Sequence, residues 1–219
     1  MRITRYIHSR LLLEKDGDRL LFDPGEISSI EGLVQPKRFR GVGTVMITHD
    51  HPDHLDPNAL CQILAPSNAR VVTKGEVTAR LAGEGIDAMT VEDVMVTAGA
   101  FSLRAIPVRP EPMLRPTLPQ VTAFLVDGQV LNVSNSFVDD LKTFVGTDLL
   151  IVPVMAPFLT EFTVAAFVRE MRPRNVIPVH DGYARNCFRP QRYDAFDPAF
   201  ADLDLRFYRV TQPGNPVEL

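Results

Sequence analysis

Residues 48 to 55 read Thr-His-Asp-His-Pro-Asp-His-Leu, which places three of the chain's five histidines and two aspartates within a very short stretch. A His-x-His-x-Asp-His pattern arises by chance in roughly two of ten thousand chains of this length and composition. The stretch therefore predicts a metal site rather than a polar loop that happens to be rich in histidine.

The spacing within this stretch suits metal coordination. His49 and His51 are two residues apart, so in extended backbone their side chains leave the same face and both imidazoles can reach one ion. Asp53 and His54, just before a predicted helix, can point to a second position nearby. Two metal sites that share a hydroxide polarise a substrate oxygen and lower the pKa of water, which is the usual arrangement for hydrolysis.

The motif is expected to lie in a loop between a strand and a helix. The β-rich run 42–48 leads into His49. Asp56 is suited to cap a helix, and Pro57 to occupy its first position, so we predict a helix from there to about Leu64. Catalytic residues often lie on such loops, held by a rigid scaffold.

The rest of the chain alternates strand-like and helix-like segments. We expect strands over 2–7, 10–14, 19–22, 71–73, 91–97, 101–107, 121–126, 129–133, 149–154, 175–179 and 203–210, and helices over 75–82, 137–144 and 160–171. Residues 109–120 hold four prolines and predict an extended loop. This order predicts a single domain over residues 1–219, with two sheets packed face to face and helices outside.

Composition excludes some classes of binding partner. A net charge of −4 and a pI near 5.7 argue against binding to nucleic acid or to an anionic membrane. No apolar run approaches the roughly 18 residues of a membrane span. Cys61 and Cys187 could form at most one disulfide, which fits a reducing compartment. We predict a soluble, cytoplasmic protein that acts on a small molecule, and the sequence leaves a homo-oligomer open.

The histidine motif resembles the metal signature of the metallo-β-lactamase fold superfamily. Further matches follow in the same order along nearly the whole chain. Ile7-His8-Ser9 is similar to the Gly-His-Ser opening of the branch related to ascorbate-6-phosphate lactonase, and residues 20–25 resemble the early Asp-Pro-Gly element. Residues 176–180 resemble the late strand that ends in a metal-binding histidine, and residues 213–219 resemble the closing hairpin. The resemblance implies an α/β (α+β) fold, a four-layer αββα sandwich of two mixed β-sheets.

The resemblance also implies roles for particular residues. The implied metal ligands are His49, His51, Asp53, His54 and His180, with Asn135 at the place of the family's bridging aspartate. Asp23 either holds a metal ligand in position or is only a turn residue. His8 either lines the pocket or is a hydrogen-bonded structural histidine, and Arg109 either holds a substrate carboxylate or phosphate or is a surface residue.

Two positions depart from the family pattern. The histidine expected after residues 105–108 is missing, and Arg109, Pro110 and Glu111 stand there instead. Asn135 is neutral and can offer a metal only its carbonyl oxygen, so it is a poor bridge between two dications. We therefore expect one tight ion on Asp53, His54 and His180. A second ion at His49 and His51, where Glu111 could substitute as a ligand, is expected to be weak or absent.

These observations favour a metal-dependent hydrolase of a small ester, lactone or phosphoester that acts through a metal-bound hydroxide, with Asp53 binding the metal and orienting the nucleophile. Zinc is the expected ion, and manganese or iron are alternatives. The alternative function is a degenerate member of the fold that binds metal or a ligand without turnover. An iron redox site is a third, minor hypothesis. The sequence does not identify the substrate.

Overall fold

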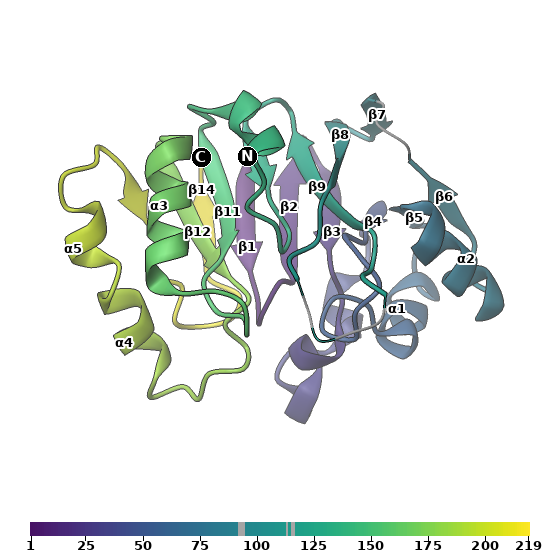
Figure 1. Cartoon of the computed structure of the whole chain (residues 1–219). Coiled ribbons are helices and arrows are strands. Elements are labelled where there is room, and N and C mark those ends of the chain that lie inside the picture. Colours follow the sequence, from purple (N-terminus) through teal and green to yellow (C-terminus); the bar gives the residue numbers. More distant parts are fainter. Residues whose placement is uncertain (92–94, 113, 115–116) are drawn as a thin grey trace.

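The first of two mixed sheets is built from both ends of the chain. It belongs to a computed structural model that describes residues 1–91, 95–112, 114 and 117–219 (Figure 1). In that part of the chain the strand order is β14-β1-β2-β3-β4-β5-β6, antiparallel from β14 to β3 and parallel from β3 to β6. Its strands are β1 (Arg2–Arg5), β2 (Leu11–Lys15), β3 (Asp18–Phe22), β4 (Thr44–Met46), β5 (Arg70–Thr73), β6 (Ala88–Thr90) and β14 (Pro216–Glu218).

The second sheet comes from the middle and later parts of the chain. Its order is β13-β12-β11-β10-β9-β8-β7, antiparallel from β7 to β10 and parallel from β10 to β13. Its strands are β7 (Met95–Ala98), β8 (Phe101–Val108), β9 (Val121–Val126), β10 (Val130–Asn132), β11 (Leu149–Pro153), β12 (Asn175–Val179) and β13 (Arg206–Phe207).

Helices cover the outer faces of both sheets. Figure 1 shows α1 (Pro57–Leu64) and α2 (Gly75–Gly83) at right, and α3 (Glu161–Met171), α4 (Arg189–Asp194) and α5 (Asp197–Phe200) at left. Short 3₁₀ helices join them: η1 (Glu26–Ser28), η2 (Ile30–Gly32), η3 (Pro36–Phe39) and η4 (Asp139–Phe144). As expected, the Asp56 carboxylate accepts hydrogen bonds from the backbone of Asn58 and Ala59 at the start of α1. Among the described residues, no helix is long and apolar enough to cross a membrane.

Three apolar layers fill the spaces between these elements. Along β2, Leu11 and Leu13 pack between the sheets, whereas Leu12 packs beneath α1 and α2. A third layer joins the second sheet to α3, α4 and α5, for example through Leu150 and Val168. Alternation along each strand thus buries both faces, which explains why these strands read as nearly continuous apolar runs. The predicted four-layer αββα sandwich of two mixed sheets is confirmed.

Some expected elements are wrong in extent or kind. The strand expected over 203–210 is reduced to β13: the backbone N–H groups of Leu203 and Leu205 bond within the turn after α5, and the Val210 carbonyl accepts a hydrogen bond from Arg5. The helix expected over 137–144 is present as a 3₁₀ helix that begins at Asp139. The closing segment is not a hairpin, since β14 pairs with β1. Of the strand expected over 91–97, residues 92–94 lie outside the described residues, and β7 begins at Met95.

The strand directions bring distant segments to one edge. The strands β1, β3 and β4 of the first sheet run the same way, as do β10 and β12 of the second. The segments that follow them hold the polar residues singled out by the sequence: His8, Asp23, residues 48–54, Asn135 and His180. The fold therefore gathers these side chains at one end of the sandwich.

Candidate metal centre

Several of these residues leave their strands through unusual backbone. Four residues at this edge have a positive φ: His8 (63°), Asp23 (47°), Ser134 (55°) and His180 (65°). This left-handed backbone region is rarely adopted by residues other than glycine. Each follows closely on a strand end, so the sharp turn redirects the chain at the edge of the sheet. Such strained positions cluster at functional sites, where the surrounding structure holds them in place.

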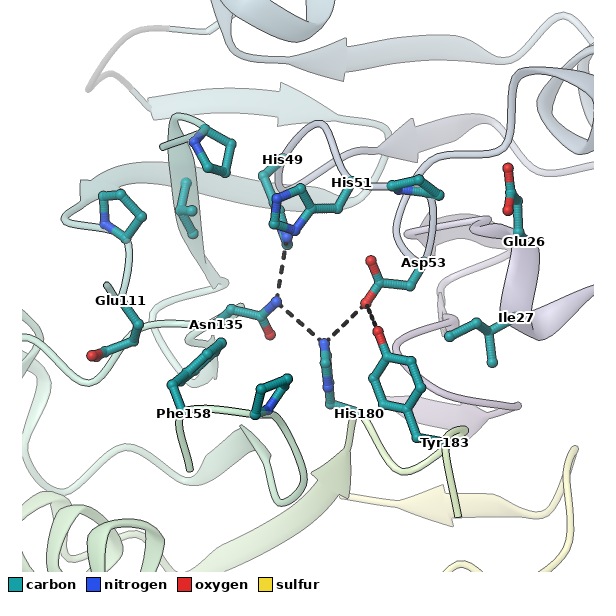
Figure 2. Close-up of a pocket in the computed structure, with 15 residues that line it drawn as sticks. Glu26, Ile27, His49, His51, Asp53, Glu111, Asn135, Phe158, His180 and Tyr183 are labelled. Atoms are coloured by element: carbon teal, nitrogen blue, oxygen red, sulfur yellow. Dashed lines mark hydrogen bonds and ion pairs between the residues drawn. The ribbon is translucent and has the colours of Figure 1, made fainter. Parts of the chain in front are cut away.

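Three histidines converge on the side chain of Asn135. Its Nδ2 atom lies 3.3 Å from His49 Nε2, 3.2 Å from His54 Nε2 and 3.3 Å from His180 Nε2. Figure 2 shows His49 and His180 approaching the amide from opposite sides. The three imidazoles and the asparagine are buried. Residues from two sheets thus present three ring nitrogens to one point.

The other ring nitrogens identify the tautomers. His54 Nδ1 lies 2.9 Å from the Asp23 carboxylate, and His180 Nδ1 contacts the Met155 carbonyl, so both Nδ1 atoms carry the proton. The Thr48 hydroxyl donates to Asp23 and therefore accepts from His49 Nδ1 at 2.9 Å. These assignments follow from the hydrogen-bond network. All three Nε2 atoms are left with lone pairs that face Asn135.

Asp53 adds a carboxylate to the same point. Its Oδ2 atom is 3.1 Å from His180 Nε2 and 3.6 Å from His54 Nε2. Burial alone would raise the pKa of Asp53, but the adjacent His180 and His8 imidazoles outweigh it and hold this pKa well below its usual range. The group is therefore a permanent anion and a weak base.

His8 supports Asp53. The Gly182 backbone N–H donates to His8 Nδ1 at 3.2 Å, so the neutral ring carries its proton on Nε2 and donates it to Asp53 Oδ2 at 3.0 Å. Burial, followed by the charge of His180, lowers the pKa of His8 to about 3. The ligand atoms of His8, Asp53, His54 and His180 lie within 4.8 Å of one another. Because its Nε2 proton is directed at Asp53, we interpret His8 as a positioning residue rather than a ligand.

The donor set fits a divalent cation. An amide NH₂ group has two hydrogens and cannot satisfy three imidazole lone pairs at once. The Asn135 Oδ1 atom is buried and has no hydrogen-bond partner among the described residues. Neutral imidazole nitrogens with protonated, hydrogen-bonded Nδ1 atoms, together with one carboxylate, are the ligands that zinc takes in proteins. His54, His180 and Asp53, whose ligand atoms lie within 4.8 Å of one another, are the residues that would hold such an ion, and the His49 ring lies beside them across Asn135.

The remaining predicted site residues fall into two groups. His51 lies beside His49, with ring centroids 4.7 Å apart, and lines the pocket. Glu111 also lines it, and its carboxylate accepts a hydrogen bond from the Phe137 backbone at 3.4 Å. The Arg109 side chain is exposed and is not part of the pocket lining, so its position gives no support to a substrate-binding role. His49 joins His54 and His180 around Asn135, rather than pairing with His51 alone as the spacing predicted.

Tyr183 is a pocket residue whose contact the sequence did not reveal. Its hydroxyl donates a hydrogen bond to Asp53 Oδ2 at 3.0 Å, and its ring is half exposed at the pocket mouth (Figure 2). Burial raises the pKa of this hydroxyl, and the nearby charge of Asp53 raises it further. Its place three residues after His180 was the available signal, but core packing explained an aromatic residue there equally well.

Two glycines allow the site to close. A Cβ atom on Gly25 would lie 1.9 Å from the Asp53 carbonyl oxygen, so the loop that carries Asp53 and His54 packs directly on this backbone. A Cβ atom on Gly182 would lie 2.5 Å from a methyl group of Ile27 and 3.0 Å from His8. The third residue of the Asp-Pro-Gly element, Gly25, therefore has to be glycine because a larger residue would collide with the Asp53 backbone.

The centre forms the floor of a cavity of about 330 Å³. Besides the metal-site residues, its wall is largely apolar. The lining residues are Glu26, Ile27, His49, His51, Pro52, Asp53, Pro110, Glu111, Pro119, Val121, Asn135, Pro157, Phe158, His180 and Tyr183. Figure 2 shows Asn135 and His180 facing the centre of this cavity, with Glu26 and Glu111 at its far sides.

Comparison with known proteins identifies the family. The family described as the beta-lactamase superfamily domain matches residues 2–180, which is more than half of the chain. The chain therefore belongs to this superfamily, and the resemblance inferred from the histidine motif is confirmed.

Individual relatives agree with this placement. Protein Rv0786c of Mycobacterium tuberculosis is 29% identical over 185 residues, covering 82% of this chain and 84% of the relative. A UPF0173 metal-dependent hydrolase of a Chelativorans species is 33% identical over 90 residues, covering 40% of this chain and 37% of the relative. The solved structure of Igni18, a metallo hydrolase from Ignicoccus hospitalis, superposes with a TM-score of 0.72 at 19% identity, covering 99% and 97% of the two chains, and so shares the fold.

Proposed function

We propose that this protein is a metal-dependent hydrolase of a small ester, lactone or phosphoester. The observation that carries the proposal is the convergence of three bare imidazole nitrogens and the Asp53 carboxylate at the floor of an open cavity. The name of the Chelativorans relative, a metal-dependent hydrolase, supports the same reading. Zinc is the proposed ion, because imidazole and carboxylate form its usual catalytic ligand set.

A bound ion would supply Lewis-acid chemistry and lower the pKa of a water molecule. Asp53 binds and orients rather than accepting a proton, because its pKa is held far below the range of a useful general base. His8 and Tyr183 both donate hydrogen bonds to Asp53 Oδ2, which fixes the carboxylate relative to His180. Asp23 and the Met155 carbonyl hold the rings of His54 and His180 with Nε2 directed at Asn135.

A second candidate is a protein that binds metal or a ligand without turnover. The feature that favours it is Asn135, which stands where the resembled family has a bridging carboxylate. A neutral amide weakens a two-ion centre, but it leaves His54, His180 and Asp53 for one ion. We therefore rank the hydrolase first.

Metal dependence of turnover tests the proposal. The protein is stripped with a chelator, reloaded with zinc, manganese or iron, and assayed with p-nitrophenyl butyrate, a γ-lactone and p-nitrophenyl phosphate. We expect hydrolysis of at least one substrate to appear only after reloading and to fall at least about 100-fold in Asp53→Asn. Asp50→Asn is the matched control, because Asp50 pairs with Arg80 outside the pocket. Tight metal binding without turnover would favour the second candidate.

A further inference from the structure

The wall of the cavity combines apolar surface with acidic groups. Ile27, Phe158 and four prolines supply most of the side chains around the metal-site residues. Glu26 and Glu111 lie on opposite sides of the cavity (Figure 2). Among the described lining residues there is no lysine or arginine.

Three arginines of the described neighbouring segments do not line the cavity. The Arg109 side chain is exposed outside the lining, although its neighbours Pro110 and Glu111 face the cavity. Arg80 pairs with Asp50, and Arg192 is bound to the Val154 carbonyl and to Glu161. The guanidinium groups of Arg80 and Arg192 are therefore engaged elsewhere, and that of Arg109 is not part of the described lining.

The charges of the wall oppose an anionic ligand. One divalent ion would bring two positive charges to a cavity that already holds the carboxylates of Asp53, Glu26 and Glu111. Recognition of a phosphate or of a second carboxylate normally uses arginine or lysine, because these form charge-assisted hydrogen bonds with the anion. An apolar group, in contrast, gains free energy by covering the proline and aromatic surface.

We propose that the part of the substrate that enters this cavity beyond the scissile bond is uncharged and apolar. The substrate class is then a neutral carboxylic ester or lactone with an aliphatic acyl group, and phosphomonoesters and dicarboxylate esters are disfavoured. This inference rests on the proposed hydrolase function, which it narrows. It concerns the substrate specificity set by the apolar and acidic lining of the cavity, whereas the hydrolase proposal concerns the metal-binding residues at its floor.

Two acids of similar size test the wall separately from catalysis. Butanoate and succinate are both carboxylates that could reach a metal ion, but succinate carries a second negative charge at its far end. Their dissociation constants are measured by calorimetry on the zinc-loaded protein, alongside kcat/KM for p-nitrophenyl butyrate, p-nitrophenyl succinate and p-nitrophenyl phosphate. We expect butanoate to bind at least about tenfold more tightly than succinate, and the butyrate ester to be preferred by a similar factor.

A matched pair of variants assigns the effect to the wall. Glu111→Gln should improve succinate binding about threefold and leave butanoate binding nearly unchanged, whereas Glu84→Gln, at an exposed position after α2, should change neither. Succinate binding as tightly as butanoate, or no measurable binding of butanoate, overturns the inference. Preferential butanoate binding without hydrolysis of any ester supports the inference about the wall and counts against the hydrolase.

Discussion

Two buried polar regions of this protein differ in whether their groups are paired within the protein. In the first, Arg5 and Asp181 have no exposed surface and form two parallel hydrogen bonds of 2.8 and 3.0 Å, with Tyr193 against the same carboxylate. In the second, three histidines direct bare Nε2 atoms at one amide beside Asp53. The first region is a closed ion pair, whereas the second presents more lone pairs than the protein itself can satisfy.

The two regions are adjacent in sequence, since Asp181 directly follows His180. A closed, buried pair costs little once formed but is costly to break, because removal of one partner leaves the other charge without compensation. An excess of converging lone pairs is instead suited to a cation from solution. The first region anchors the chain directly after His180, and the second is the proposed ligand site.

The largest effect should come from breaking the closed region. In Asp181→Asn, Arg5 remains buried without its negative partner, so we expect the free energy of unfolding to fall by about 3–5 kcal/mol. Urea denaturation of the metal-free protein measures this loss. The double variant Arg5→Met with Asp181→Leu is the control and should recover at least half of it. An unchanged stability in Asp181→Asn would show that the pair does not hold the structure.

The next effect should come from a clash behind the open region. In Gly25→Ala the new methyl group meets the Asp53 carbonyl, so the loop carrying Asp53 and His54 has to shift. We expect a destabilisation of about 1–3 kcal/mol and a zinc affinity at least about tenfold weaker, measured by denaturation and by competition with a chromophoric chelator. Gly75→Ala has open space around the added atom and should change neither quantity.

The histidines of the open region should make the stability of the metal-free protein depend on pH. Burial lowers the pKa of His8 to about 3 and holds the pKa of His49 well below its usual range, so both stay neutral in the folded, metal-free protein at pH 5. The unfolded chain protonates them near pH 6.5, and therefore binds more protons than the folded state. The free energy of unfolding should therefore fall from pH 7 to pH 5, by about 2 kcal/mol for His8, with a contribution of the same sign from His49.

His54 contributes to this pH dependence with the opposite sign. Burial alone would lower the pKa of His54, but the Asp23 carboxylate raises it, so its contribution to stability is present at low pH and is lost as the pH rises through the folded value. Urea denaturation of the metal-free protein and of His8→Gln across this range measures the balance. Equal slopes for the two proteins would contradict the assignment of His8 as a buried neutral group.

The smallest effect should come from adding one charge to the open region. Asn135→Asp supplies a carboxylate between the three histidines, so we expect a second ion to bind, with an affinity at least about tenfold higher than any second binding to the unmodified protein. Calorimetric zinc titration measures the stoichiometry and both affinities. Asn58→Asp, exposed in the first turn of α1, is the control. An unchanged stoichiometry in Asn135→Asp would show that Asn135 does not limit the number of ions.

Local patterns predicted much of this arrangement, and long-range contacts explain what they missed. The histidine spacing, the Asp56 cap of α1 and the order of strand ends indicated both the fold and the residues that gather at its edge. The partners of those residues depend on distant segments. The Met155 carbonyl that orients His180 and the Arg5 side chain that pairs with Asp181 carry no signal in the sequence. Nor does spacing reveal that Thr48 and Ser134 turn His49 toward Asn135.

Metal content tests the central claim, that the open region is a site for one tightly held ion. The protein is loaded with zinc, dialysed exhaustively against metal-free buffer and examined by elemental mass spectrometry, in parallel with Asp53→Asn and Asp50→Asn. We predict close to one equivalent of zinc in the unmodified protein and in Asp50→Asn, and clearly less in Asp53→Asn. Two equivalents retained by the unmodified protein, or none, would contradict this account.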